Sequence, residues 1–149
     1  MGIRYAHTNL VARHWRSLAD FYVKALDCEL LLPQRDGQGP WVEDLTGVPG
    51  SAIRGAHLRL PGYADGGPTL EIFQYNIAEQ GPPPAINRPG LAHLAFQVDD
   101  VPAARQRLRA AGGSDLAKMV TVPITGAGTI TVLYMTDPEG NIIELQRWD

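Results

Sequence analysis

Hydrophobic residues recur at helical spacing in two segments of this chain, three or four residues apart, so that each set forms one face of an α-helix. The first set is Trp15, Leu18, Tyr22 and Ala25, and the second is Val101, Ala104, Leu108 and Ala111. Asp99 and Asp100 precede the second set as capping candidates, and Pro102 suits the first turn of a helix. Two amphipathic helices are therefore predicted.

The remaining apolar segments are short, rich in β-branched, leucine and aromatic residues, and separated by turn residues, which is typical of strands. The predicted strands are residues 3–11, 28–32, 53–60, 69–75, 91–98, 119–122, 129–135 and 141–148. Residues 34–50 contain glycine, proline and few periodic apolar residues, so we expect a long loop there.

The two halves of the chain repeat each other at an offset of 86 residues. At this offset the four apolar positions of the first helix fall on those of the second, and His7 falls on His93. Near its end, each half has a strand that carries a glutamate, which is Glu71 in the first half and Glu144 in the second. Each half therefore reads strand, helix, strand, strand, strand, with a histidine on its first strand and a glutamate on its last.

This repeat predicts one α+β domain over residues 1–149. Module one covers about residues 1–80 and module two about residues 90–149. Residues 81–89 between them begin with Gly-Pro-Pro-Pro, which indicates a stiff linker.

Strand alternation places the four repeated side chains, His7, Glu71, His93 and Glu144, on the sheet faces away from the helices. If the halves curl toward each other, two imidazoles and two carboxylates converge in one groove. Such a nitrogen and oxygen set suits Zn, Ni, Co, Fe or Mn. A lone histidine or glutamate on a strand is usually structural or solvated, but a matching pair in each half favours a metal site.

Composition and charge exclude other classes of function. Thirteen basic and sixteen acidic residues give a net charge of −3 without a lysine-rich run, so we expect no nucleic-acid partner. The apolar runs are too short for a membrane span, and the N-terminal residues lack the apolar segment of a secretory signal. Cys28 is the only cysteine, which excludes an intrachain disulfide. We therefore expect a soluble, cytoplasmic protein.

Residues 7–10, 17–22, 90–98 and 137–145 carry a resemblance to the vicinal oxygen chelate superfamily. This superfamily includes glyoxalase I, methylmalonyl-CoA epimerase, extradiol dioxygenases and the fosfomycin- and bleomycin-resistance proteins. The resemblance implies paired βαβββ modules that form a U-shaped, partly open mixed sheet around a metal, with the helices outside. It also implies a homodimer that binds a small-molecule substrate.

The glyoxalase I branch is the most similar, because its His, Glu, His, Glu ligands match His7, Glu71, His93 and Glu144. This resemblance implies a divalent-metal-dependent lyase or isomerase, in which a metal stabilises an enolate and a carboxylate moves the proton. Glu144 is the first candidate for this catalytic base, and Glu71 is the second. Val11 stands where bacterial glyoxalase I has a glutathione-binding arginine, so we expect a substrate that is not linked to glutathione.

Further side chains are candidates for contacting the substrate, namely Asn9, His57, Arg59, Phe73, Tyr75, Gln97, Met135 and Trp148. His57 and Arg59 would meet an anionic substrate, although a solvated strand face explains them equally well.

Two alternative functions stay open. An extradiol-type dioxygenase would use Fe(II) or Mn(II) with open coordination positions. A metal-free, resistance-type protein would instead hold a ligand between Phe73, Tyr75, Met135 and Trp148, residues that serve equally well in a core.

Overall fold

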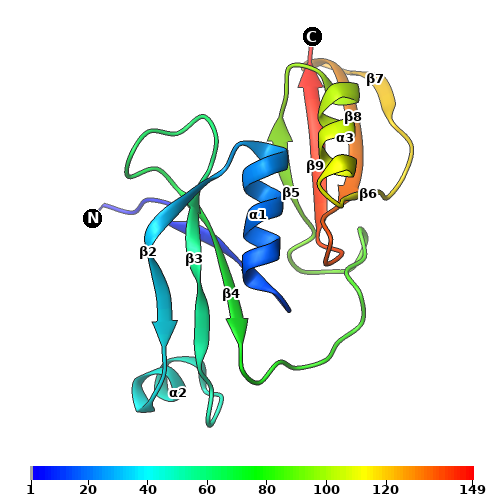
Figure 1. The fold of residues 1–149 in the computed structure, drawn as a ribbon. Helices are drawn as coiled ribbons and strands as arrows, with labels where there is room; N and C mark the ends of the chain where they lie inside the picture. Colours follow the sequence, from blue (N-terminus) through cyan, green and yellow to red (C-terminus); the bar gives the residue numbers. More distant parts are fainter. Residues whose placement is uncertain (1) are drawn as a thin grey trace. The chain divides into compact units, whose positions relative to one another are not determined.

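The computed structural model describes residues 2–149, which divide into two compact units, unit 1 up to Gln80 and unit 2 from Gly81 to Asp149. The described residues form three helices and nine strands, and the strands make up two mixed sheets (Figure 1). This arrangement confirms the expected α+β class. None of these three helices is long and apolar enough to cross a membrane.

Unit 1 is built on a four-stranded sheet with the order β1-β4-β3-β2. Its elements are β1 (His7–Val11), α1 (Trp15–Leu26), β2 (Glu29–Gly37), α2 (Pro40–Thr46), β3 (Ile53–Arg59) and β4 (Thr69–Tyr75). β1 runs parallel to β4, and the other neighbours are antiparallel. The helix α1 covers one face of the sheet, where Leu18, Phe21 and Tyr22 are buried. The side chains of Leu58 and Ile72 meet them from β3 and β4 and complete the core of unit 1.

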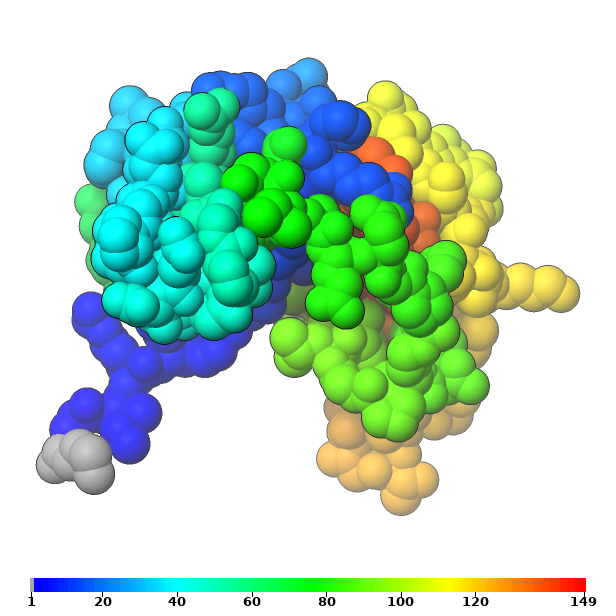
Figure 2. Space-filling model, turned by 90° about the horizontal axis from the view of Figure 1, so that it is seen from below, coloured from blue at the N-terminus to red at the C-terminus, as the bar shows by residue number. Residues whose placement is uncertain are grey.

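The prediction of a long loop over residues 34–50 is wrong, because β2 continues to Gly37 and is followed by the helix α2. Pro40 stands in the first turn of α2, and Gly47 ends it in the left-handed conformation with φ of 69°. Val42 is the buried residue of this short helix, so no helical periodicity marks it in the sequence. Figure 2 shows α2 and its neighbouring turn in cyan, as a compact block at the surface.

Unit 2 repeats this topology. Its elements are β5 (His93–Gln97), α3 (Val101–Ala110), β6 (Ser114–Asp115), β7 (Val120–Ile124), β8 (Gly128–Thr136) and β9 (Ile142–Trp148). β5 is parallel to β9, β9 is antiparallel to β8, and both β6 and β7 pair with β8. The two short strands β6 and β7 therefore take the place that β2 occupies in unit 1. Val101 and Leu108 of α3 and Leu133, Met135 and Ile143 of the sheet are buried in the core of this unit.

The sequence signals at α3 are confirmed. Asp100 accepts a hydrogen bond from the backbone N–H of Ala103 at 2.8 Å, and Pro102 lies in the first turn. Gly112 follows the helix with φ of 108°, a conformation that favours glycine. The helix α1 begins differently, because the side chain of Gln74 on β4 accepts the backbone N–H of Trp15 at 3.1 Å.

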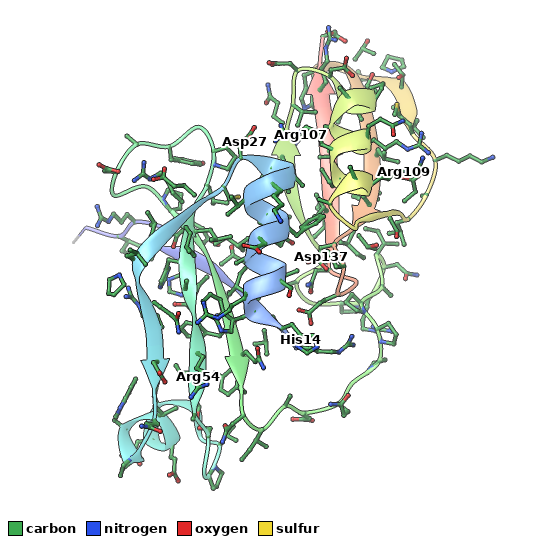
Figure 3. The ribbon with its side chains drawn as sticks, viewed as in Figure 1. His14, Asp27, Arg54, Arg107, Arg109 and Asp137 are labelled. Atoms are coloured by element: carbon green, nitrogen blue, oxygen red, sulfur yellow. The ribbon has the colours of Figure 1, made fainter. Side chains whose placement is uncertain are left out.

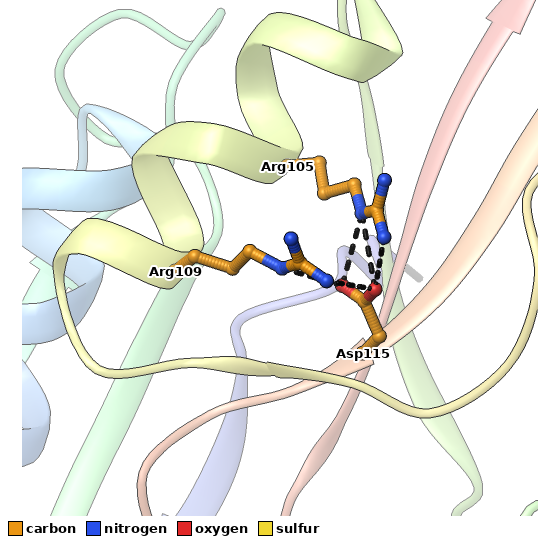
Figure 4. Close-up of polar contacts among 3 residues, drawn as sticks. All are labelled: Arg105, Arg109 and Asp115. Atoms are coloured by element: carbon orange, nitrogen blue, oxygen red, sulfur yellow. Dashed lines mark hydrogen bonds and ion pairs between the residues drawn. The ribbon is translucent and has the colours of Figure 1, made fainter.

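Asp115 of β6 binds two arginines of α3 (Figure 4). Nε of Arg105 and Nε of Arg109 donate to Oδ1 of Asp115 at 3.1 and 3.2 Å. These hydrogen bonds, that of Arg105 above all, lower the pKa of Asp115 to about 2. Because this pKa is below the usual value of 3.8, the contribution of Asp115 to stability is present above about pH 4 and is lost as the pH falls toward 2.

We expect the Asp115→Asn variant to lose less stability than the native protein between about pH 4 and pH 2, since it lacks this titrating group. Urea unfolding midpoints at the two pH values measure the difference. High salt should reduce this difference, because the side chains of Asp115 and its two arginines are partly exposed to solvent. Asp36→Asn is the matched control, since Asp36 forms only a 3.7 Å ion pair with Arg54. Equal acid-induced losses in native protein and Asp115→Asn would contradict this assignment.

Cys28 lies in the core of unit 1 just before β2, with 3% of its surface exposed. Burial, with a smaller contribution from Asp27, raises the pKa of its thiol to about 12. Because the thiolate is the reactive form, we expect an aromatic disulfide reagent to leave Cys28 unmodified at neutral pH and to react after urea unfolding. Rapid release of the coloured thiol from the folded protein would contradict this prediction.

Candidate functional site

Three side chains of metal-ligating type come together on the face of the unit 1 sheet opposite α1. His7 lies on β1, Glu71 on β4 and His57 on β3. Glu71 pairs in register with Asn9 on one side and with His57 on the other, so residues of three adjacent strands point the same way. Oε1 of Glu71 lies 3.5 Å from Nε2 of His7, and Oε2 lies 2.7 Å from Nε2 of His57. The three ligand atoms lie within 4.8 Å of one another.

Neighbouring polar groups fix the orientation of this cluster. Nδ2 of Asn9 donates to Oε1 of Glu71 at 2.8 Å. Nδ1 of His57 and the hydroxyl of Thr69 are 2.8 Å apart, which leaves Nε2 of His57 directed at Glu71. Only 11% of the Glu71 side chain is exposed. Burial lowers the pKa of His57 although Glu71 acts to raise it, which favours the neutral imidazole that binds metals.

Unit 2 contains a related arrangement. Nε2 of His93 on β5 lies 3.1 Å from Oε2 of Glu144 on β9. Glu144 pairs in register with Ala95 and Tyr134, as Glu71 does with Asn9 and His57. Tyr134 on β8 therefore occupies the position that His57 has in unit 1. Its hydroxyl donates a hydrogen bond to Glu144, and its ring centroid lies 5.1 Å from that of His93. Burial, together with Glu144, raises the pKa of Tyr134.

The structure thus brings each predicted histidine close to the predicted glutamate of its own module: His7 to Glu71, and His93 to Glu144. Each pair joins the first and last strand of a module, as the repeat predicts. The combination of all four as ligands of one metal stays a prediction.

The predicted substrate contacts of unit 1 take different places. Asn9 and His57 contact Glu71 directly, as described above. The guanidinium of Arg59 forms ion pairs with Glu29 at 3.2 Å and Asp65 at 2.6 Å. Strand alternation places Phe73 and Tyr75 on the same face of β4 as Glu71.

The predicted substrate contacts of unit 2 also differ among themselves. Gln97 is exposed, and Nε1 of the partly exposed Trp148 donates to the side chain of Gln146 at 2.6 Å. Met135 is fully buried on the face of β8 opposite Tyr134. Met135 is therefore a core residue of unit 2, which is the role that the sequence left open beside the substrate contact.

Sequence reasoning missed two members of these clusters. It interpreted His57 either as a substrate contact or as part of a solvated strand face, and it did not select Tyr134. Both residues stand on the strand before their glutamate in the hairpins β3–β4 and β8–β9. Pairing each glutamate across its predicted hairpin would have pointed to them, had the register of the hairpins been known.

A cavity of about 500 Å³ in unit 1 lies at the beginning of α1 and the adjoining ends of β3 and β4. It is lined by His14, Trp15, Arg16, Ser17, Ala52, Arg54, Gln74, Tyr75 and Asn76. Figure 3 labels His14 and Arg54 from this set. Its two arginines already have partners, since Arg16 donates to Gln34 and Arg54 pairs with Asp36. The His–Glu clusters are therefore the stronger candidate site, because metal-ligating atoms converge there.

Comparison with models of known protein families shows which superfamily the chain belongs to. The model of the Glyoxalase/Bleomycin resistance protein/Dioxygenase superfamily matches residues 4–145. The chain belongs to this superfamily. The resemblance found in the sequence is thereby confirmed, and members of this glyoxalase superfamily typically bind a metal. The imidazole nitrogens of His7 and His57 and the carboxylate of Glu71 form a donor set that could hold a divalent cation.

Solved structures of the superfamily share the fold. A glyoxalase family protein from Bacillus cereus has a TM-score of 0.81 at 18% identity, over 99% of this chain and 95% of that chain. A glyoxylase/bleomycin resistance protein/dioxygenase domain from Frankia sp. EAN1pec has a TM-score of 0.59 at 22% identity, over 100% and 93%. A glyoxalase family protein from Enterococcus faecalis has a TM-score of 0.57 at 24% identity, over 97% and 96%. No curated protein matches the chain.

Proposed function

We propose that this protein is a divalent-metal-dependent lyase or isomerase of glyoxalase I-like type, acting on a small oxygen-chelating substrate that is not linked to glutathione. The observation that carries this proposal is the repeated His–Glu pair, formed by His7 with Glu71 and by His93 with Glu144. The pairs occupy equivalent register positions in two sheets of a chain whose superfamily typically binds metal. The proposal includes the predicted homodimer, which light scattering of the purified protein would test.

A metal bound by these residues would act as a Lewis acid that stabilises an enolate of the substrate. The two carboxylates differ in what surrounds them. Glu71 is engaged by Asn9 and by two histidines, which suits a fixed ligand. Glu144 contacts His93 and accepts the hydroxyl of Tyr134. We therefore assign the transfer of the proton next to the substrate carbonyl first to Glu144 and second to Glu71.

Elemental analysis of the purified chain, with proton exchange as the activity readout, tests this function. We expect near-stoichiometric Zn, Ni or Co, and metal-dependent exchange of the α-proton of small hydroxyketones in deuterated water, followed by NMR. His7→Ala should lose both, whereas His14→Ala, a histidine at the α1 cavity, is the matched control. A chain that binds no metal even after reconstitution would overturn the proposal and favour a ligand-binding protein.

An extradiol-type dioxygenase is the second candidate, and the His7, His57 and Glu71 cluster favours it. Two histidines and one carboxylate with open positions are the donor set of many non-haem Fe(II) oxygenases. Bound iron, with oxygen consumption in the presence of a catechol, would select this function over the lyase or isomerase.

A further inference from the structure

We propose that Arg35 of β2 binds a carboxylate group of the substrate beside the His–Glu cluster of unit 1, so that the protein selects anionic hydroxyketones over neutral ones. This inference rests on the proposed function, and it adds to that function a substrate class and a residue that determines specificity. Arg35 would make the contact with an anionic substrate that the sequence predicts for Arg59.

Arg35 lies on the same face of the unit 1 sheet as the cluster. It pairs in register with Gly55, which is two residues from His57 on β3, so the side chains of Arg35 and His57 point the same way. The register is irregular between Leu31 and Arg35, and Nη1 of Arg35 donates to the carbonyl oxygen of Pro33 at 3.0 Å. Because Leu31 is the register partner of His57, this contact turns the guanidinium back along β2 toward His57.

The positive charge of Arg35 is not neutralised by a carboxylate. Within residues 2–149, which the structure describes, its guanidinium forms no ion pair and donates to a backbone carbonyl instead. The adjacent Asp36 points to the opposite face of the sheet, where it pairs with Arg54. Arg59 differs from Arg35, because two carboxylates already neutralise it. Arg35 is therefore the better candidate to bind an anion, since a guanidinium forms paired hydrogen bonds with a carboxylate.

The guanidinium is close enough to the cluster for one small molecule to contact both. Burial lowers the pKa of His57, Glu71 opposes this change, and the charge of Arg35 adds to the lowering. Two residues along a strand are about 6.6 Å apart, so a carboxylate at Arg35 would lie about that far from substrate oxygens held at the cluster. A chain of two methylene groups between the ketone and the carboxylate spans this separation.

Phe73 of β4 provides an apolar surface for such a chain. It pairs in register with Gly55, the same residue that pairs with Arg35 from the other side. A Cβ at Gly55 would lie 2.7 Å from Cδ1 of Phe73, so the partly exposed ring lies against this glycine. Methylene groups are stabilised on such a surface. A carboxylate suits the site better than a phosphate monoester does, because one guanidinium balances one negative charge.

Two matched hydroxyketones test the inference, 5-hydroxy-4-oxopentanoate and 1-hydroxypentan-2-one, which differ in the terminal carboxylate. Exchange of their α-protons in deuterated water gives kcat and KM, and calorimetry of the metal-loaded, full-length protein gives Kd. We expect the native kcat/KM to be about 10-fold higher for the carboxylate compound. Arg35→Gln should remove this preference by raising KM and Kd of that compound about 10-fold, with kcat unchanged. The values for the neutral compound should stay within about twofold of native.

Arg54→Gln is the matched control, because Arg54 stands on the opposite face of β3 and should not contribute to the preference. Native circular dichroism of both variants establishes that they are folded. Equal native kcat/KM for the two compounds would overturn the inference. Weaker binding of both compounds to Arg35→Gln, or loss of the preference in Arg54→Gln, would overturn it as well.

Calorimetry separates the failure of this inference from the failure of the proposed function. A native chain that exchanges neither compound, but binds the carboxylate compound only while Arg35 is present, would overturn the proposed reaction and support the carboxylate site. A native chain that exchanges both compounds equally well would support the reaction and overturn the site. A chain that neither binds nor exchanges either compound would overturn both.

Discussion

The Glu71→Gln variant is expected to lose its bound metal, with metal affinity reduced about 100-fold or more. Glu71 lies at the centre of the unit 1 cluster, with one carboxylate oxygen directed at each of His7 and His57. Glutamine has the same shape, and its amide oxygen can still accept the hydrogen bond of Asn9, so we expect the variant to fold. The change removes the one negative charge that the cluster offers to a cation.

Metal content by elemental analysis, together with the melting temperature of the metal-free protein, measures this effect. The matched control is Glu29→Gln on β2, because the exposed Glu29 carboxylate pairs with Arg59 and takes no part in the cluster. The control should keep native metal content. Native metal content in Glu71→Gln as well would show that the cation is held elsewhere.

The Gly55→Ala variant is expected to lose about 3 kcal/mol or more of unfolding free energy. A Cβ at Gly55 would lie 1.9 Å from the carbonyl oxygen of Ile72 and 2.7 Å from Cδ1 of Phe73. The oxygen belongs to the backbone of β4, so it cannot move aside without disturbing the pairing of β3 with β4. His57 lies two residues further along β3, and the same disturbance would move it relative to Glu71.

Urea unfolding and cobalt titration of Gly55→Ala check the two parts of this prediction. Gly81→Ala is the control, because a Cβ there would meet nothing within 4 Å. We expect its stability to stay within about 0.5 kcal/mol of native. A Gly55→Ala protein as stable as the control would contradict the prediction, because it would mean that β3 and β4 accommodate a Cβ at position 55 without loss of unfolding free energy.

The fold could be predicted where one face of an element is regularly apolar. The four apolar positions of each repeated helix predict α1 and α3. The alternation of apolar and polar residues around Glu71 predicts the strands that carry the site. The helix α2 was not predicted, because Val42 is its one buried residue and a single buried residue gives no periodic pattern. The strand β6 was not predicted, because it consists of Ser114 and Asp115 alone and its pairing with β8 depends on tertiary structure.

The site could be predicted as far as the internal repeat extends. The repeat identifies His7 with Glu71 and His93 with Glu144, because equivalent strands carry them. It cannot identify the partners across each hairpin, since the register there depends on how many residues the connecting turn takes up. His57 faces Glu71 because of that turn, which is longer in the first module than in the second.

The position of β1 at the end of the unit 1 sheet links metal binding to local unfolding. Among the described residues of this sheet, β1 pairs with β4 alone, and the Asn9–Glu71 hydrogen bond joins positions 62 residues apart. Closing so long a loop is entropically costly, whereas β2, β3 and β4 pair with neighbours close in sequence. We expect β1 to detach first when unit 1 opens, which would remove His7 and leave His57 beside Glu71. A cation held by His7, His57 and Glu71 would stabilise the pairing of β1 with β4. Its dissociation rate would then follow the rate at which β1 opens.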